Sequence, residues 1–353
     1  MNKPVVVLAP HWRQMSELFS ASREAELRRV CEVVWGQDEP IPESVLEAAL
    51  PTASVLIASI PVVSAASLAK MPRLKTVIEV SGSFPNTIDY PACARKGIEV
   101  LSCAPGFRSS VAEMGLAMAL AAARGLVTEH EAFRKGREGW LKDNPETDFS
   151  LFGAKVGFVG FGQIARELSR LLRPFQPRIR AFDPWLPAGE ADRHGAGTCG
   201  LEELASWARC LFVTAVPTTE NRGMVSSDIL RRMPDHSVVV LLSRAHVVDF
   251  NALMSEAGSG RLRVAADVFP AEPLAVESPL RKIGNVILSP HRAAAVAGGR
   301  HLIGDMIVGD LRALFSGETT RKLTRANAQT IGKLVETCGA LQVAEMATRR
   351  HTN

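Results

Sequence analysis

Residues 156–183 are V-G-F-V-G-F-G-Q-I-A-R-E-L-S-R-L-L-R-P-F-Q-P-R-I-R-A-F-D, and this stretch decides the fold. It begins with an apolar run, residues 156–159, which is typical of a buried parallel strand. Gly160, Gly162 and Ala165 follow in the G-x-G-x-x-G/A spacing. In that spacing, a glycine-rich turn leads from a strand directly into a helix.

The second half of the stretch continues the pattern. Apolar residues recur at helical spacing until Pro174, where a helix must end. A second apolar run, residues 179–182, leads to the acidic residue Asp183. The whole stretch therefore predicts a strand, a tight turn, a helix, a strand and a carboxylate.

Each of these pieces has a physical use in dinucleotide binding. Gly160 permits the tight turn, and Gly162 lets a pyrophosphate approach the backbone at a helix N-terminus. Asp183 can accept hydrogen bonds from the ribose hydroxyls and would repel a 2′-phosphate, which favours NAD over NADP. A methyltransferase shares this outline, so the motif by itself leaves that alternative open.

Length and composition limit the other classes of function. The chain has 353 residues, enough for about two domains, with 46% hydrophobic residues and a net charge of +4. We expect no nucleic-acid partner, no membrane span and no signal peptide. None of the six cysteines falls in a C-x-x-C pair, which favours reduced thiols in the cytoplasm over a metal site.

Short apolar runs alternate with helical patterns along most of the chain. This alternation predicts parallel sheets covered on both faces, the architecture of two Rossmann-like doubly wound α/β domains. A long helical stretch, residues 110–134, is expected to connect them, and a helix at 302–315 returns to the first domain. The predicted division is a flavodoxin-like substrate domain (1–109 and 296–330), an NAD-binding Rossmann domain (110–295) and a basic tail (331–353).

Three polar residues each follow an apolar strand downstream of the glycine motif. They are Arg244 in V-V-L-L-S-R, Glu272 in V-A-A-D-V-F-P-A-E-P and His291 in V-I-L-S-P-H. In open α/β sheets, ligands bind beyond the carboxyl ends of the strands. We therefore expect an arginine, a carboxylate and an imidazole to face one cleft beside a nicotinamide.

With these motifs in place, the chain resembles the D-2-hydroxyacid dehydrogenase family. The resemblance rests on the glycine loop with Asp183, on S-R-A-x-x-V-D, D-V-F-x-x-E-P and S-P-H, and on S-G-S-F-P-N-T-I-D at 81–89. It covers the chain from about Val77 to the last helix. It implies an NAD-dependent oxidoreductase that interconverts 2-keto and D-2-hydroxy acids, working as a homodimer with its active site between two domains.

The resemblance also implies a role for each polar residue. Arg244 would bind the substrate carboxylate and polarise the keto oxygen. His291 would donate a proton to that oxygen as hydride arrives, and Glu272 would orient His291 and favour its protonated form. Backbone N–H groups of the substrate loop, at Ser81, Gly82 and Ser83, would hold the substrate carboxylate. The cofactor would be held by Gly160, Gly162, Gln163, Ile164, Asp183, Val216, Pro217, Ser243 and Asp267.

Several positions depart from the family pattern. Phe84 stands where a second glycine is usual, Asn86 stands for an aspartate, and Ala245-His246 follows the catalytic arginine. We expect a structural role for His246. Arg108 and Arg292 are additional cations near the expected cleft, and together they hint at a substrate with a second anionic group.

Other functions remain as alternatives. A non-enzymatic NAD(H)-binding regulator shares this fold and these three polar residues. A phosphite dehydrogenase-like enzyme is disfavoured by Ser83, where a lysine is expected, and formate dehydrogenase by Glu272, where glutamine is expected. A methyltransferase has no use for an arginine, a glutamate and a histidine at three strand ends.

Overall fold

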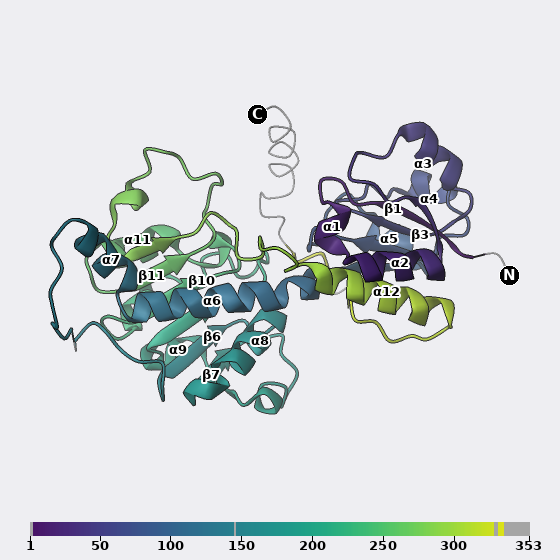
Figure 1. The fold of residues 1–353 in the computed structure, drawn as a ribbon. Coiled ribbons are helices and arrows are strands. Elements are labelled where there is room, and N and C mark those ends of the chain that lie inside the picture. The colour runs from purple at the N-terminus through teal and green to yellow at the C-terminus, as the bar shows by residue number, and fades with distance from the viewer. Residues whose placement is uncertain (1–2, 145, 328–330, 335–353) are drawn as a thin grey trace. The chain divides into compact units, whose positions relative to one another are not determined.

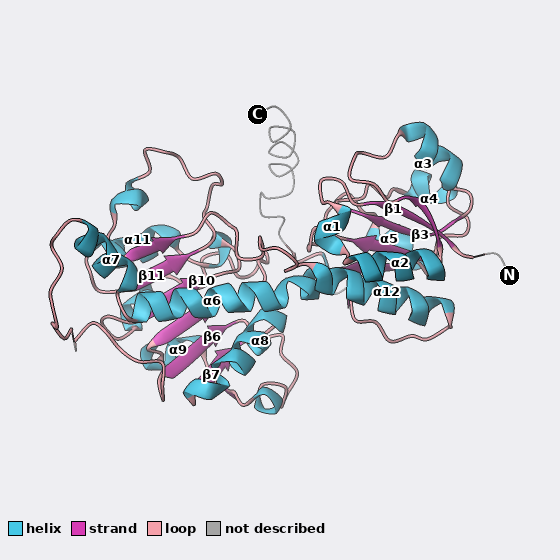
Figure 2. Ribbon diagram, viewed as in Figure 1, coloured by secondary structure: helices cyan, strands magenta, loops and turns pink. Residues whose placement is uncertain are grey.

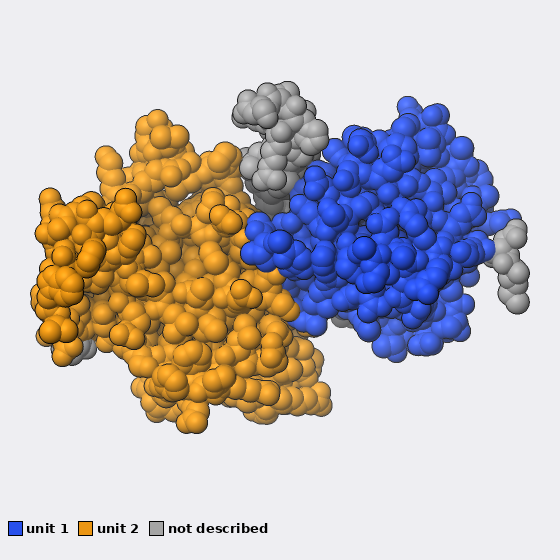
Figure 3. Space-filling view, viewed as in Figure 1, with its two compact units in different colours: residues 1–108, 294–353 blue, residues 109–293 orange. Residues whose placement is uncertain are grey.

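The computed structural model describes residues 3–144, 146–327 and 331–334. These residues form two compact units (Figure 3). Unit 1 contains the described residues up to Arg108 and from Ala294 onward, and unit 2 is Ser109–Ala293. The predicted domain limits stood one or two residues later, at 109 and 295. Most of the predicted tail, including a proposed helix at 331–346 and Cys338, lies outside the described residues.

Unit 1 is built on a six-stranded sheet with the strand order β13-β5-β4-β3-β1-β2. Five strands pair in parallel, and β13 is antiparallel to β5. The parallel part has the flavodoxin-like order 2-1-3-4-5, whose switch point lies between β1 and β3. Its strands are β1 (Val5–Ala9), β2 (Glu32–Trp35), β3 (Ala53–Ala58), β4 (Thr76–Glu79), β5 (Glu99–Ser102) and β13 (Thr324–Arg325).

Both faces of this sheet are covered by a hydrophobic core. Successive residues of a strand point to opposite faces, so neighbouring residues of β1 belong to different cores. Val6 and Leu8 belong to a core that includes residues of α2 and α12, whereas Val7 belongs to the core on the other face. Figure 1 shows α2 and α12 next to each other. The helices are α1 (Met15–Leu18), α2 (Ala21–Val30), α3 (Glu43–Ala49), α4 (Ala65–Ala69), α5 (Tyr90–Arg95), the 3-10 helix η1 (Ala104–Phe107) and α12 (His301–Phe315).

Unit 2 is built on a seven-stranded, fully parallel sheet with the order β12-β11-β10-β9-β6-β7-β8. This is the Rossmann order with one further strand, and the chain reverses direction across the sheet between β6 and β9. Its strands are β6 (Lys155–Val159), β7 (Arg178–Phe182), β8 (Gly197–Thr198), β9 (Cys210–Val213), β10 (Val238–Leu241), β11 (Arg263–Ala266) and β12 (Val286–Leu288).

Helices flank this sheet, as Figure 2 shows. They are α6 (Arg108–Ala123), α7 (Leu126–Arg134), α8 (Gln163–Leu172), α9 (Leu201–Trp207), α10 (Ser227–Arg232) and α11 (Phe250–Gly258). The helical stretch predicted at 110–134 consists of two helices, α6 and α7. Gly125 adopts φ +58 and separates α6 from α7, because a left-handed residue cannot continue an α-helix.

Within the described residues, no single helix is long and apolar enough to cross a membrane. By length and composition alone, a pair bent by 62° passes that test, Ala104–Ala123 with Leu126–Arg134. Half of α6 is buried inside the protein, including Ala112, Met118 and Ala119. Such burial is typical of a core helix.

Candidate active site and cofactor site

The glycine turn after β6 has the shape that a pyrophosphate requires. Gly160 adopts φ +84, and a Cβ there would lie 2.4 Å from the Cα of Ala215, so only glycine fits. A Cβ on Gly162 would meet no atom within 4 Å. Gly162 is also the N-cap of α8 and provides no side-chain cap for the first N–H groups of that helix. The turn therefore fits a dinucleotide phosphate.

Asp183 lies directly after β7 and is tied to this turn. One carboxylate oxygen accepts the N–H of Phe161 at 2.8 Å, and the other accepts the N–H of Trp185 at 2.9 Å. A carboxylate can accept about four hydrogen bonds, so Asp183 keeps acceptor capacity for ribose hydroxyls. The glycine turn and the acid thus form one connected element.

The remaining predicted cofactor residues lie at strand ends of the same sheet. Gln163 is exposed and Ile164 half-buried at the start of α8, and Val216 is exposed after β9 with Pro217 half-buried beside it. The hydroxyl of Ser243 is buried, and no described residue bonds to it. An orphaned buried hydroxyl at a ligand-binding edge suits a polar cofactor atom.

The three polar residues follow three adjacent strands. Arg244 follows β10, Glu272 lies in the segment after β11, and His291 comes three residues after β12. His291 Nδ1 lies 2.6 Å from Glu272 Oε2, and Glu272 Oε1 accepts the N–H of Phe269 at 2.8 Å. Because Nδ1 is engaged by Glu272, Nε2 is the ring nitrogen left to exchange a proton with a substrate.

Electrostatics connects these three side chains. Burial raises the pKa of Glu272, but hydrogen bonding and charge from His291, the Phe269 N–H and the charge of Arg244 outweigh it and hold that pKa below its usual range. Burial lowers the pKa of the Arg244 guanidinium, while the carboxylates of Glu272 and Asp267 raise it. The site therefore combines an ionised carboxylate, a histidine bonded to it and a desolvated cation.

Asp267 anchors the loop that carries His291. Its buried carboxylate accepts bonds from the Ser289 hydroxyl, from the N–H of Arg292 at 3.0 Å and from the N–H of Ala293 at 3.1 Å. The N–H of His291 donates to the Asp267 carbonyl at 2.8 Å. The expected bond from Asp267 to a nicotinamide carboxamide stays a prediction.

The substrate loop in unit 1 holds a carboxylate of the chain itself. Glu79, the last residue of β4, is fully buried and accepts the N–H groups of Ser81, Gly82 and Ser83 at 2.5 to 3.0 Å. Burial raises the pKa of Glu79, against the hydrogen bonds that lower it. The predicted use of these N–H groups by a substrate carboxylate therefore requires Glu79 to release them.

Known proteins identify this arrangement. The family model described as "D-isomer specific 2-hydroxyacid dehydrogenase, NAD binding domain" matches residues 116–293, about half of the chain. The chain belongs to this family. Its unit 2 contains the family's NAD-binding domain, and its two sheets, parallel except for β13, form a Rossmann-like two-domain fold.

Individual members of the D-2-hydroxyacid dehydrogenase family show the same likeness. A phosphoglycerate oxidoreductase from Rhizobium etli, solved by crystallography, is 34% identical, with a TM-score of 0.82 over 92% of this chain and 99% of that one. Glyoxylate reductase from Korarchaeum cryptofilum is 30% identical over 70% of this chain and 75% of its own length. D-3-phosphoglycerate dehydrogenase from Mycobacterium tuberculosis is 28% identical over 90% of this chain, which spans only 58% of that relative.

Two residues that departed from the family pattern have ordinary contacts. His246 Nε2 lies 2.8 Å from the carbonyl oxygen of Thr218, which ties it to the loop after β9. Arg108 donates to the Pro105 carbonyl at 3.4 Å within unit 1, whereas Arg292 is an exposed residue of unit 2. The predicted joint role of Arg108 and Arg292 in binding a second anionic group stays a prediction.

Sequence reasoning missed Glu79 and also Arg13, a buried arginine that follows β1. The only signal was position, since Arg13 comes four residues after the first strand, where α/β sheets bind ligands.

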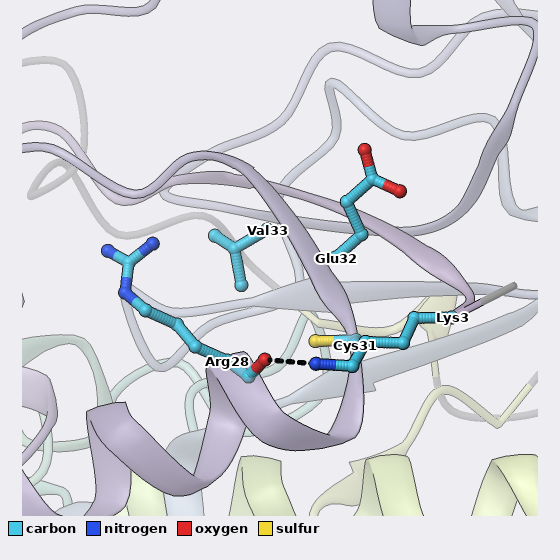
Figure 4. Close-up of a pocket in the computed structure, with 5 residues that line it drawn as sticks. All are labelled: Lys3, Arg28, Cys31, Glu32 and Val33. Atoms are coloured by element: carbon cyan, nitrogen blue, oxygen red, sulfur yellow. Dashed lines mark hydrogen bonds between the residues drawn. The ribbon is translucent and has the colours of Figure 1, made fainter.

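A surface cavity of about 380 Å³ lies elsewhere, lined by Lys3, Arg28, Cys31, Glu32 and Val33 (Figure 4). It is at the amino ends of β1 and β2, the edge opposite to that expected for ligands. Its ammonium group, on Lys3, donates to the Arg28 carbonyl at 3.0 Å, and burial raises the pKa of Cys31 to about 11. An unreactive thiol and a bonded amine give this cavity no chemistry.

Proposed function

We propose that this protein is an NAD-dependent oxidoreductase that interconverts a 2-keto acid and a D-2-hydroxy acid. The observation that carries the proposal is the 2.6 Å contact of His291 with Glu272, with Arg244 on the neighbouring strand end of an NAD-binding domain. The relatives named glyoxylate reductase and D-3-phosphoglycerate dehydrogenase support this class of reaction.

The residues of the chain divide the work as follows. Gly160 to Ile164 and Asp183 would hold NAD, which would supply or accept the hydride at the substrate carbon. Arg244 binds the carboxylate of the substrate and polarises the adjacent keto oxygen, because its planar guanidinium donates two parallel bonds. His291 donates its Nε2 proton to that oxygen during reduction and takes it back during oxidation. Glu272 fixes the orientation of the ring through Nδ1.

A panel of 2-keto acids, assayed by loss of NADH absorbance, tests the reaction directly. We expect turnover on at least one 2-keto acid and formation of the D-hydroxy acid, identified by chiral chromatography. Tight NADH binding with no turnover on any member would contradict the enzymatic assignment and favour a regulator that binds NAD(H).

We also propose a homodimer, supported by apolar side chains on α7 and the loop that follows it. Leu126 and Phe133 are largely exposed, Trp140 is 77% exposed and Leu141 fully exposed. Phe133 and Trp140 contact edge to face at 6.0 Å between their ring centroids. A soluble monomer rarely leaves such a patch open, and a second copy would cover it. Sedimentation equilibrium at the monomer mass of 38.1 kDa would contradict the dimer.

We place the protein in the cytoplasm. All five described cysteines carry free thiols, which suits a reducing compartment. Localisation of the tagged full-length chain in its own cell tests this, and export from the cytoplasm would contradict it.

A further inference from the structure

Unit 1 carries a cluster of nitrogen donors that the proposed reaction does not use. Arg13 follows β1, and its guanidinium lies 4.2 Å from the ring centroid of Trp12 and 5.4 Å from that of Phe107. Arg300 stands at the start of α12, far along the chain. Both arginines approach the same carboxylate oxygen of Glu17, Arg13 at 3.9 Å and Arg300 at 3.3 Å.

The two arginines of this cluster are both largely buried, and both form their ion pair with the same carboxylate, that of Glu17. The side chains of Arg13 and Arg300 are only 10% and 15% exposed, and they share one carboxylate. The other nearby carboxylate, Glu79, bonds to the N–H groups of its own loop and acts on Arg13 only through its charge. Burial, with the charge of Arg300, lowers the pKa of Arg13 to about 10. Burial of Arg13 thus outweighs the negative charge of Glu17 and Glu79, so a further anion bonded to it would stabilise this arrangement.

Three donors in the cluster also lack acceptors. Nε1 of Trp12, Nε of Arg13 and Nε of Arg300 are all buried, and none of them bonds to any described residue. Buried donors in proteins almost always find a partner, so three orphans in one cluster call for an acceptor group. An oxyanion supplies several acceptor oxygens and the missing negative charge together.

The cluster lies where a sheet of this topology binds ligands. Arg13 follows the carboxyl end of β1, next to the switch point between β1 and β3. Phe107, under the Arg13 guanidinium, packs against the substrate loop, because a Cβ on Gly82 would lie 2.5 Å from its ring. Donors, switch point and substrate loop therefore meet at one edge of unit 1.

We propose that Arg13, Arg300 and the indole N–H of Trp12 form an oxyanion-binding site in unit 1, which takes a phosphate or carboxylate group. The site goes beyond the proposed oxidoreductase activity and does not depend on it. The competing interpretation is that Arg13 only packs between Trp12 and Phe107 as a structural cation, and the experiments below separate the two.

The first experiment titrates inorganic phosphate into the full chain saturated with NADH, which occupies the phosphate-binding turn of unit 2. Isothermal calorimetry at constant ionic strength should show saturable binding. Arg13→Met should weaken it by about 10- to 100-fold, since charged hydrogen bonds are lost. Arg13→Lys should retain part of it. Arg73→Met, at an exposed arginine of the same unit, is the matched control and should change nothing.

A substitution at Glu17 should change phosphate affinity in the opposite direction to Arg13→Met. Glu17→Gln removes the carboxylate that competes for both arginines, so phosphate should bind more tightly than in the native protein. A purely structural role for Arg13 predicts no such tightening. Native affinity in Arg13→Met, or unchanged affinity in Glu17→Gln, would overturn the proposal.

Thermal stability gives a second, independent measurement. Phosphate should raise the melting temperature of the native chain, because a ligand of the folded state stabilises it by mass action. In Arg13→Met, phosphate should no longer raise the melting temperature. The variant should be no less stable than the native chain in phosphate-free buffer, since the substitution also removes a buried charge. Loss of stability in phosphate-free buffer, with the phosphate effect intact, would instead establish a structural arginine.

The last arm identifies the source of the oxyanion. If a substrate carries it, Arg13→Met should lower kcat/KM for oxaloacetate, which has two carboxylates, about 10-fold or more relative to pyruvate, which has one. If a free anion occupies the site, phosphate binding falls in Arg13→Met while both kcat/KM values stay equal to native. Failure of the oxidoreductase assignment removes this arm alone, and the calorimetric result still decides the site.

Discussion

Both units place a carboxylate at the carboxyl edge of parallel strands, but the groups that bond to the carboxylate differ between the two units. In unit 2, Glu272 accepts a bond from His291 at 2.6 Å and faces the charge of Arg244. In unit 1, Glu79 accepts three backbone N–H groups of its own loop, and Arg13 is left 3.9 Å from a shared partner, Glu17.

The difference shows what each carboxylate can do. A carboxylate bonded to a titratable side chain orients that side chain and tunes its charge, which is the requirement of acid–base chemistry. A carboxylate bonded to backbone N–H groups fixes a loop and forms no direct ion pair with the neighbouring cations, which share Glu17. This difference supports the two roles proposed above, proton transfer in unit 2 and binding of an anion in unit 1.

Removing the histidine should break the unit 2 arrangement with the largest effect. We expect His291→Ala to lower kcat by about 10²- to 10⁴-fold, because the general acid is lost. The NADH dissociation constant, measured by fluorescence, should stay close to native. His246→Ala is the matched control, since that ring bonds only to the Thr218 carbonyl among described groups. Near-native turnover in His291→Ala would contradict the mechanism.

A third carboxylate, Asp183, both fixes a turn and can bind a ligand. It accepts two backbone N–H groups and keeps acceptor capacity for ribose hydroxyls. NADH should be used about 10- to 100-fold better than NADPH, a difference of roughly 1–3 kcal/mol. Steady-state kinetics with both cofactors should show that Asp183→Ala narrows this preference.

Two further variants complete the Asp183 measurement. Asp183→Asn keeps an oxygen for the turn but loses the charge, so it should also narrow the preference. Asp192→Ala, at an exposed acid of the same unit, should leave the preference unchanged. Equal use of NADH and NADPH by the native protein would show that Asp183 does not select the cofactor.

The unit 1 carboxylate should matter for stability. Glu79→Gln replaces an acceptor of three N–H groups by an amide that also donates, so at least one buried N–H loses its partner. We expect the free energy of unfolding to fall by about 1–3 kcal/mol at about pH 4, measured by urea denaturation. An unchanged stability at that pH would mean that the loop does not need Glu79.

The sequence predicted the parts of this comparison that depend on local pattern. Apolar runs marked the strands that carry Arg244, Glu272 and His291, because a strand buried on both faces is a continuous run of hydrophobic residues. The G-x-G-x-x-A spacing and Asp183 likewise marked the cofactor turn. Short elements were missed, such as β2 (Glu32–Trp35), since four residues directly after a helix give no periodic signal.

The unit 1 cluster could not be predicted in the same way. Arg13 and Arg300 meet at Glu17 only because the chain returns to unit 1 at Ala294, shortly before α12. Glu79 ends the run T-V-I-E, where a glutamate at a strand end is usually solvated, and nothing local shows that its own loop folds over it. Contacts between segments so distant in sequence depend on the tertiary fold.

The smallest predicted effect is a pair of opposite pH dependences. The pKa of Glu272 is lowered in the folded protein, so its stabilising contribution is present above the ordinary value of 4.5 and is lost as pH falls through the lowered value. The pKa of Glu79 is raised by burial, so the folded protein loses stability as pH rises from 4.5 through that raised value.

Relative to the native protein, Glu272→Gln should therefore become less stable as pH rises from about 3 to 6, by about 0.2–1 kcal/mol because the pair is partly exposed. Glu79→Gln should instead be most destabilised at low pH and recover toward neutral pH. Urea denaturation of the three proteins across this range measures both slopes. Slopes of the same sign would show that burial and pairing do not distinguish the two carboxylates.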